Sequence, residues 1–484
     1  MDERTLLKRT PAGLFIDGGW HAAATEATFD VVDPATEDVI ARVADAQPQD
    51  GDAALTAADH AQAAWGETPP RERAELLRSI FDAVIEHTEE LALLITLEMG
   101  KSLNEARGEV TYAAEFLRWF SEEAVRARGQ YLRAPNGTGR ILTVKRPVGP
   151  CVLITPWNFP LAMATRKIGP ALAAGCTSVI KPATQAPLTT LRFAEIAHDC
   201  GIPPGVINVI TTTSAGEVMG PLLTDPRTRK LSFTGSTEVG RRLISQASDQ
   251  VLRVSMELGG NAPFLVFDDA DLDAAIEGAM IAKMRNIGES CVAANRFIVH
   301  RAIADRFVDE LANRMGSLTV GRGTEPGVEV GPLIDEAALA KVDHLIDTAV
   351  ADGARVRVGG RSREGPGYFY LPTVVTDVPA NAELLREEIF GPVAPVTTFN
   401  AEEEALQAAN SSPYGLVAYA YTQDLDRALR LGDQLDVGMV GINRGIVSDP
   451  AAPFGGIKHS GVGKEGGDEG MEEYLVTRYV ALPA

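Results

Sequence analysis

The sequence predicts an α/β protein with two doubly wound domains and a small β arm, and three observations support this. From residue 150 to residue 258, short apolar runs alternate with stretches of helical length. A second alternating series runs from about residue 264 to residue 445. Strands joined through helices need crossover connections, which favour parallel sheets covered on both faces. Over residues 129–149, apolar residues alternate around Asn136-Gly137, a dipeptide typical of a hairpin turn.

The elements before the first series follow from turn signals and helical spacing. Residues 14–45 read as short strands separated by turns that contain glycine and proline. Apolar residues recur at helical spacing from 71 to 99, where Gly100 supplies a stop, and a further helix is expected over roughly 103–127. The hairpin at 129–149 then forms a protruding arm.

The first alternating series gives five strands and four helices. The expected strands are 151–155, 177–181, 206–210, 230–234 and 253–258, and the expected helices are 160–174, 187–200, one ending near 223 and one beginning at 237. After the second series, a glycine-rich stretch leads to a final strand over 474–482.

Composition and charge limit the classes of function. The chain has 484 residues, of which 45% are hydrophobic and 23% charged, so it is neither mainly disordered nor fibrous. Its 45 basic and 66 acidic side chains give a net charge of −21. This surface argues against nucleic acid and anionic membranes as partners, and any anionic ligand must be held by local cations.

Cysteine usage and the first residues bear on metals and location. The four cysteines, Cys151, Cys176, Cys200 and Cys291, are too few for a disulfide scaffold. None lies in a pattern with metal-ligand spacing, so we expect no bound metal. The N-terminus lacks the apolar segment of a signal peptide, and no apolar run is long enough to span a membrane. We therefore expect a cytoplasmic protein.

Three side chains are candidates for catalysis, and one of them, Glu257, lies at the carboxyl end of a strand, where α/β sheets form their ligand crevice. Cys291 follows a helical pattern among small residues, Glu257 ends a strand before two glycines, and Asn158 lies between a strand and a helix. Singly, such residues are more often a buried cysteine, a solvated glutamate and a helix-capping asparagine. The glycines of FTGSTEVG (233–240) allow a nucleotide to approach a strand-to-helix turn, but the segment lacks the full dinucleotide-binding spacing.

Together with other segments, these residues resemble the aldehyde dehydrogenase family. The segments, in chain order, are PWNFP (156–160), KPAT (181–184), FTGSTEVG (233–240), MELGGNAP (256–263), GESCVAANR (288–296), EEIFGPVAPV (387–396) and PFGGIKHSGVGKEG (453–466). Within the family, residues 154–183, residues 253–271 and the ending EYLVTRYV resemble the succinate-semialdehyde dehydrogenases.

The resemblance implies an aldehyde dehydrogenase-like fold with a division into domains. Residues 1–124 and 148–257 are expected to form the cofactor-binding domain, and 258–458 the catalytic domain. Residues 125–147 and 459–484 are expected to form the oligomerisation arm and a C-terminal segment. The resemblance also implies a homodimer or homotetramer. The arm is expected to pair with another subunit, because an exposed two-stranded hairpin is marginally stable alone.

The resemblance also assigns catalytic roles that suit the chemistry. An aldehyde becomes a hydride donor once a nucleophile has added to its carbonyl, and Cys291 matches the family nucleophile. Asn158 and the backbone amide of Cys291 match the oxyanion hole, and Glu257 matches the base that activates water to hydrolyse the thioester.

The cofactor is expected to be NADP or NAD, with NADP slightly favoured. A glutamate at the position of Thr184, as in many NAD-preferring relatives, would repel a 2′-phosphate, and the neutral threonine beside Lys181 removes that repulsion. The residues expected at the cofactor are Thr155, Pro156, Trp157, Asn158, Lys181, Ala183, Thr184, Gly235, Ser236, Leu258, Glu388 and Phe390.

The expected substrate is a short aldehyde with a carboxylate at its far end. Arg166, Arg285 and Ser448 match residues that hold this carboxylate in semialdehyde enzymes, although a structural role for Arg166 stays open. The expected reaction is NAD(P)-dependent oxidation of succinic semialdehyde to succinate, with glutarate semialdehyde or another ω-semialdehyde or aliphatic aldehyde as the alternative. A CoA-acylating enzyme is disfavoured by Glu257, and a non-catalytic protein by the presence of Cys291, Glu257 and Asn158 together. Ala293 stands where several relatives have a second cysteine.

Overall fold

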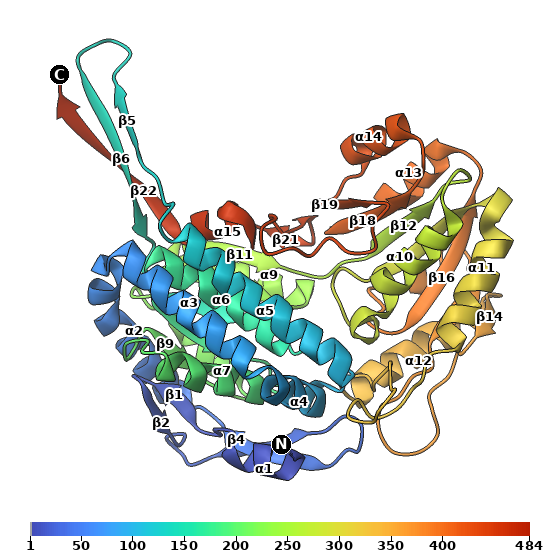
Figure 1. Ribbon diagram of the computed structural model, residues 1–484, viewed down its shortest axis with the longest axis horizontal. Helices are drawn as coiled ribbons and strands as arrows, with labels where there is room; N and C mark the ends of the chain where they lie inside the picture. Colours follow the sequence, from blue (N-terminus) through green and yellow to red (C-terminus); the bar gives the residue numbers. More distant parts are fainter. Residues whose placement is uncertain (1) are drawn as a thin grey trace.

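The computed structural model describes residues 2–484 and has the predicted α/β fold (Figure 1). Two large sheets lie on either side of the molecule, each between helices, and a three-stranded arm projects from it. The two alternating series of the sequence correspond to the two large sheets.

The first sheet has eight strands in the order β2-β1-β9-β8-β7-β10-β11-β21. They are β1 (Leu14–Ile16), β2 (Gly19–His21), β7 (Cys151–Ile154), β8 (Ser178–Lys181), β9 (Ile207–Val209), β10 (Lys230–Thr234), β11 (Arg253–Glu257) and β21 (Gly461–Val462). The five central strands, β9 to β11, are parallel, and antiparallel strands flank them. From β7 the chain runs outward to β9 and then returns to place β10 on the other side of β7. This reversal creates a switch point at the carboxyl ends of β7 and β10.

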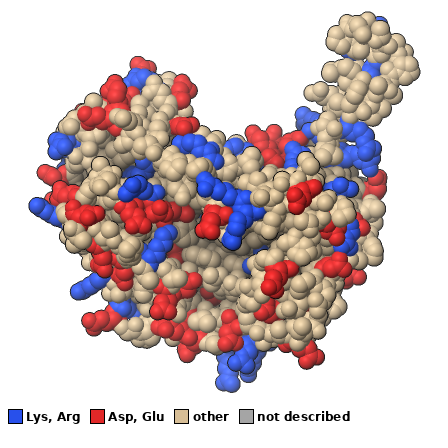
Figure 2. Space-filling model, turned by 180° about the vertical axis from the view of Figure 1, so that it is seen from behind, with Lys and Arg blue, Asp and Glu red and all other residues tan. Residues whose placement is uncertain are grey.

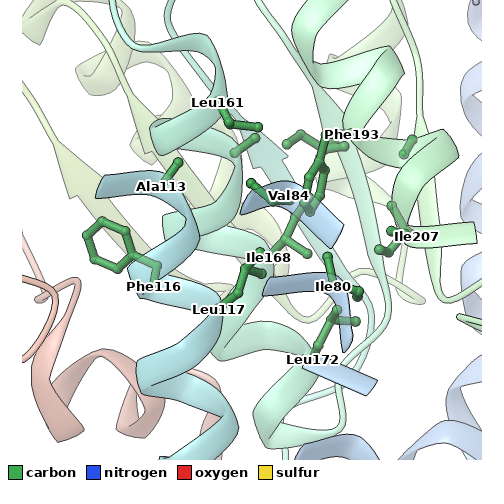
Figure 3. Close-up of a cluster of buried hydrophobic side chains, with 14 of the residues drawn as sticks. Ile80, Val84, Ala113, Phe116, Leu117, Leu161, Ile168, Leu172, Phe193 and Ile207 are labelled. Carbon is green, nitrogen blue, oxygen red and sulfur yellow. The ribbon is translucent and has the colours of Figure 1, made fainter. Parts of the chain in front are cut away.

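Helices cover both faces of this sheet because successive strand residues point to opposite sides. Leu153 and Ile180 pack against α3 (Pro70–Glu86), α4 (Thr88–Met99), α5 (Leu103–Glu123), α6 (Pro160–Ala174) and α7 (Leu188–Asp199). Their neighbours Val152 and Val179 pack on the other face, against α2 (Pro48–Glu67), α8 (Ala215–Thr224) and α9 (Thr237–Ala247). Figure 3 shows the first of these clusters, in which side chains of α3, α5, α6 and α7 meet.

The second sheet has seven strands in the order β14-β15-β16-β13-β12-β18-β19. They are β12 (Ala262–Val266), β13 (Ala294–His300), β14 (Arg355–Val358), β15 (Thr373–Thr376), β16 (Val393–Phe399), β18 (Val417–Tyr421) and β19 (Met439–Ile442). One face is covered by α10 (Leu272–Met284), α11 (Arg301–Gly316) and α12 (Glu336–Ala351), and the other by α13 (Glu402–Asn410) and α14 (Leu425–Gln434).

The arm joins segments that are far apart in the sequence. Its middle strand β6 (Gly139–Pro147) pairs antiparallel with β5 (Gln130–Arg133) and with β22 (Leu475–Pro483). Gly137 has φ +73°, as the Asn136-Gly137 turn requires. The predicted hairpin and final strand are confirmed, and the structure adds that they belong to one sheet.

The remaining elements are small. They are α1 (Glu3–Arg9), the hairpin of β3 (Thr28–Val32) and β4 (Val39–Ala44), the pair β17 (Tyr414–Gly415) and β20 (Ile457–Lys458), α15 (Gly467–Glu472), and three 3-10 turns at Ser248–Gln250, Arg285–Gly288 and Glu383–Leu385.

Two expectations about the helices differ from the structure. The stretch 71–99 forms two helices, α3 and α4, which meet at His87, and not one. Neither α1 nor α2 was predicted. In α2 most of the buried apolar residues are alanines, which mark a helix face weakly.

The surface mixes charges of both signs over a net acidic chain. In Figure 2, basic and acidic side chains are interspersed over the body, while most of the arm beyond its base is uncharged. Within residues 2–484, no helix combines the length and apolarity that crossing a membrane would require.

Candidate active site

The candidate site lies at the switch point of the first sheet. The turn after β7 carries Asn158, which lies two residues before the start of α6. The turn after β10 carries Gly235 and Ser236, and the Ser236 hydroxyl caps α9 by accepting a hydrogen bond from the Val239 amide. Glu257 is the last residue of β11, as predicted. Three neighbouring parallel strands thus present these residues at one edge, where α/β sheets bind their ligands.

Cys291 reaches this edge from the second half of the chain. It lies between α10 and β13, after a turn in which Asn286, Ile287 and Gly288 have φ values of +58°, +62° and +78°. A left-handed conformation is costly for a β-branched residue such as Ile287, so the surrounding contacts must maintain this turn.

A cavity of about 290 Å³ brings together most of the predicted site residues. It is lined by Pro156, Trp157, Asn158, Arg166, Gly235, Ser236, Leu258, Arg285, Cys291, Glu388, Phe390 and Ser448. Glu257, Thr155, Lys181, Ala183 and Thr184 are not among its lining residues. Of these, Thr184 lines a separate hollow that it shares with Asp335 and Tyr368.

The thiol of Cys291 is held in its protonated form. Burial raises its pKa to about 12, although the nearby Arg166 acts in the opposite direction. A thiolate is the reactive species, so a base or a bound ligand must promote ionisation.

Glu257 and Glu465 form a pair of buried carboxylates with unequal surroundings. Glu465 accepts hydrogen bonds from Arg166 and from Lys167, and these cations outweigh the effect of burial and lower its pKa. Both carboxylate oxygens of Glu257 lack a partner among the described residues, so burial, assisted by the charge of Glu465, raises its pKa. Glu257 therefore carries the proton while Glu465 keeps its charge.

A glycine allows the backbone to approach Glu257. Gly455 has φ +157°, and a side chain at this position would come within 2.8 Å of Glu257 Oε1. This close approach helps to bury the carboxylate.

Asn158 is held at both its backbone and its side chain. Its amide Nδ2 donates to the carbonyl oxygen of Glu289 at 3.0 Å, and its own carbonyl oxygen accepts from Lys101 and Asn286. An asparagine amide has two N–H groups, so the second can donate to a ligand.

Aromatic and acidic side chains shape the part of the cavity expected to hold the nicotinamide. Trp157 and Phe390 meet edge to face, with ring centroids 5.5 Å apart, and Phe390 has φ +57°. Burial raises the pKa of Glu388 to about 7, and its Oε1 accepts the Gly260 amide at 3.0 Å.

The residues present fit a dinucleotide. Gly235 and Ser236 bring the N-terminus of α9 to the cavity, and backbone N–H groups at such an end favour pyrophosphate. Lys181 ends β8, and burial lowers the pKa of its ammonium to about 8, so it is still mostly charged at pH 7.

Two arginines line the cavity, and they differ in their contacts with other side chains. Arg166 is buried, pairs with Glu465 and lies over the Phe454 ring at 3.8 Å, while its Nη2 has no partner within residues 2–484. Arg285 lies over the rings of Tyr112 (5.4 Å) and Phe159 (5.1 Å), and no carboxylate of the described chain forms an ion pair with it. Arg285 is therefore the cation more available to an anionic ligand.

Several residues of the site were not predicted. Tyr112 comes from the middle of α5, and the cavity wall also includes Phe159, Met163 and Phe454. Phe159 and Phe454 lie inside the motifs PWNFP and PFGGIK, which could have identified them. Tyr112 lies in no motif. Over residues 2–484 there is no cluster of three or more His, Cys, Asp or Glu that could hold a metal.

Comparison with known proteins agrees with this geometry. The model of the aldehyde dehydrogenase family matches residues 20–480. A succinate-semialdehyde dehydrogenase of Paenarthrobacter nicotinovorans is 58% identical over 444 residues, which are 92% of this chain and 99% of the relative. A glutarate-semialdehyde dehydrogenase of Pseudomonas aeruginosa is 50% identical over 97% of each chain. A crystal structure of an E. coli NADP-dependent enzyme has a TM-score of 0.97 and 48% identity over 98% of each chain. The chain therefore belongs to the aldehyde dehydrogenase family and is an NAD(P)-dependent oxidoreductase.

Proposed function

We propose that this enzyme oxidises a short aldehyde with a carboxylate at its far end, and that succinic semialdehyde, oxidised to succinate, is its substrate. The observation that carries this proposal is Arg285, a cation in the cavity wall that lacks a carboxylate partner among the described residues. The relatives named as succinate-semialdehyde and glutarate-semialdehyde dehydrogenases support the same substrate class.

The proposed reaction begins at Cys291. Once the thiol proton has passed to the basic form of Glu257, the sulfur adds to the aldehyde carbon, and the oxygen that gains negative charge accepts hydrogen bonds from the free N–H of Asn158 and from the Cys291 backbone amide. When bound, NAD(P) would accept the hydride that leaves this carbon, and the carbon would then be held to Cys291 as a thioester. Trp157, Glu388 and Phe390 are proposed to orient the nicotinamide end, and Gly235 and Ser236 to accommodate the pyrophosphate.

Glu257 is proposed to act as the base. It lies close enough to Cys291 for its charge to raise the pKa of the thiol, and its own raised pKa makes it a stronger base than an ordinary carboxylate once it is deprotonated. Once deprotonated it removes a proton from water, which attacks the thioester carbon and releases the acid and the thiol. A water-activating base favours hydrolysis over transfer of the acyl group to CoA.

The far end of the substrate is proposed to bind Arg285, with Arg166 Nη2 and the Ser448 hydroxyl as additional donors. A planar guanidinium matches a carboxylate through parallel hydrogen bonds, and the rings of Tyr112 and Phe159 orient the Arg285 group. Because the chain has a net charge of −21, this local cation must provide the selection.

The experiment that tests this function compares succinic semialdehyde with butanal, each with NAD and with NADP. Removing one partner of a desolvated charge pair costs about 2–5 kcal/mol, roughly thirty- to several-thousand-fold in kcat/KM. Arg285→Ala should lose this much on succinic semialdehyde and little on butanal, which has no carboxylate. The matched control is Arg363→Ala, because Arg363 also lies over a ring, that of Phe369 at 3.8 Å, but does not line the cavity. Equal losses on both aldehydes would contradict the proposal.

The similarity to the glutarate-semialdehyde dehydrogenase of Pseudomonas aeruginosa supports glutarate semialdehyde as a second candidate substrate. One extra methylene is worth about 1–3 kcal/mol of discrimination, so both aldehydes belong in the assay. A tenfold higher kcat/KM for glutarate semialdehyde would reassign the preferred substrate and leave the substrate class unchanged.

NADP is proposed as the preferred cofactor. Thr184 is uncharged, so no carboxylate at this position repels a 2′-phosphate, and Lys181 lies three residues before it at the end of β8. The E. coli NADP-dependent structure supports this preference.

The domain division and the oligomeric state are also proposals. The two large sheets support a cofactor-binding unit at 1–124 and 148–257 and a catalytic unit at 258–458. The segment 459–484 contributes both β21 to the first sheet and β22 to the arm. Exposed apolar side chains on the arm support its proposed role in joining subunits into a homodimer or homotetramer.

A further inference from the structure

A cluster of polar side chains, buried except for the partly buried Glu105, lies behind Asn158 and Cys291. It joins the turn between α4 and α5, the body of α5, and the turn that precedes Cys291. Its members are Lys101, Glu105, Glu109, Asn286 and Glu289. None of them lines the cavity.

Lys101 and Glu109 form an ion pair that is almost completely buried. The Lys101 ammonium donates to Glu109 Oε2 at 2.5 Å and to the carbonyl oxygen of Asn158 at 2.9 Å. The other oxygen of Glu109 accepts the backbone N–H groups of Leu161 and Ala162 in the first turn of α6. The pair therefore fixes the backbone on both sides of Phe159, where the β7–α6 turn enters its helix.

Asn286 connects the same carbonyl to the turn before the nucleophile. Its Nδ2 donates to the Asn158 carbonyl oxygen at 3.0 Å and to the Glu289 carbonyl oxygen at 2.8 Å. Its own backbone N–H donates to Glu105 Oε1 at 2.6 Å. Since Asn158 Nδ2 also donates to the Glu289 carbonyl, two donors hold each of these two carbonyl oxygens.

These contacts form a closed ring between Asn158 and a residue two positions before Cys291. A buried ion pair is weak evidence for stability, because the cost of desolvation offsets most of the attraction. The left-handed backbone of Asn286 and Ile287 likewise costs free energy, and it persists because the surrounding contacts enforce it. What the arrangement does provide is a fixed relative position for the Asn158 amide and the Cys291 backbone.

We propose that Lys101 and Asn286 are positioning residues of the oxyanion hole. This inference rests on the roles proposed above for Asn158 and Cys291. Lys101 and Asn286 act through the Asn158 backbone and do not contact the substrate. The ring uses one N–H of the Asn158 amide and directs the other to the reacting oxygen. Misplacement of a catalytic group by 1 Å can cost about 10²-fold in rate.

The test uses Lys101→Met, which removes the ammonium and keeps an unbranched side chain, and Asn286→Gly, which removes the amide and still accepts φ +58°. Each should lower kcat by about 10- to 100-fold, within the range for a disturbed oxyanion hole. The KM for the aldehyde and the Kd for NADP should change by less than about threefold, because binding contacts are intact.

Two further readouts separate positioning from general damage. The rate at which iodoacetamide alkylates Cys291 should stay near the wild-type value, since this displacement develops no oxyanion. In an Asn158→Ala background, either variant should lower kcat by less than about threefold, because coupled residues are non-additive. The control is Lys230→Met, which removes another fully buried lysine that hydrogen-bonds Ser255, outside the cluster.

Each result bears on the inference. If Lys101→Met does not fold, Asn286→Gly decides, because it leaves the Lys101–Glu109 pair intact. The inference would be overturned if either variant lowered kcat by the same factor in the Asn158→Ala background as in the wild type. It would also be overturned if the alkylation rate of Cys291 fell by the same factor as kcat. Near-wild-type kcat in both variants, with Asn158→Ala strongly impaired, would overturn this inference and leave the proposed function unchanged. Near-wild-type kcat in Asn158→Ala itself would overturn the proposed function as well.

Discussion

The carboxylates of Glu257 and Glu465 differ in charge because their partners differ. Glu465 is bound by two cations and stays ionised, while Glu257 has no partner among residues 2–484 and takes the proton. Beside the cavity there is thus a fixed negative charge that compensates Arg166 and Lys167, and a neutral acid that can become a base. A single difference in hydrogen bonding separates these two functions.

The first prediction concerns the covalent step. Cys291→Ala should abolish turnover while NADP still binds, because the nucleophile is lost and the cofactor contacts are not. The measurement is steady-state activity with a fluorescence titration of NADP. Cys200→Ala is the control, since Cys200 is a partly buried cysteine at the end of α7. Substantial turnover in Cys291→Ala would exclude a thiol mechanism.

The second prediction is a pH dependence. The raised pKa of Glu257 means that its basic form increases as the pH rises, so thioester hydrolysis should accelerate with pH through that pKa. Glu257→Gln cannot ionise and should show a burst of NADPH equal to the active sites, followed by slow, pH-independent turnover. Rapid mixing at several pH values measures both phases. An unchanged pH profile in the variant would assign the base elsewhere.

The third prediction tests cofactor choice. Thr184→Glu should weaken NADP far more than NAD, because it places a carboxylate near the 2′-phosphate. Thr184→Gln is the matched control, since it adds similar volume without charge. The measurement is the ratio of kcat/KM for the two cofactors. A ratio that moves equally in both variants would show that size, and not charge, matters at this position.

At the scale of elements, the order of strands and helices could be predicted because each parallel strand is a short apolar run ended by a turn. The break at His87 could not, because helical spacing of apolar residues continues across it. Recognisable motifs contain Cys291, Glu257 and Asn158, so these residues could be predicted. Tyr112 could not, because it reaches the cavity from an ordinary amphipathic helix. The ion pair of Lys101 and Glu109 depends on how α4, α5 and α6 pack, which no local pattern encodes.

The fourth prediction concerns the helices that support the site. Leu117 of α5 is fully buried in the cluster of Figure 3, where α3, α5 and α6 meet. Leu117→Ala should lower the free energy of unfolding by about 2–5 kcal/mol through lost burial and the cavity it leaves. Leu425→Ala, at a leucine that is 71% exposed, is the control. Thermal unfolding gives the effect, and KM values should be unchanged in the folded variant.

At the scale of the whole molecule, the arm carries an apolar surface on an otherwise charged protein. The strand register places Leu132 (49% exposed) and Tyr479 (61% exposed) on the same face of the arm sheet. Side chains of this size on a projecting sheet are typical of surfaces that another subunit covers.

The fifth prediction follows from that surface. Leu132→Lys combined with Tyr479→Lys should dissociate the oligomer, since burying two ammonium groups in an interface is costly. Sedimentation velocity measures the mass, and Val350→Lys, at an exposed position on α12, is the control. An unchanged mass would show that this face of the arm is not an interface.

The pairing of β6 with both β5 and β22 has a consequence for biosynthesis. β5 leaves the ribosome just before β6, but the other partner of β6 is encoded more than three hundred residues later, at Leu475–Pro483. Throughout that interval β6 has an open edge that could pair with a neighbouring nascent chain. Translation therefore sets an order of events. Both large sheets can form before the arm is complete, because the third strand of the arm is not available until residues 475–483 have been made.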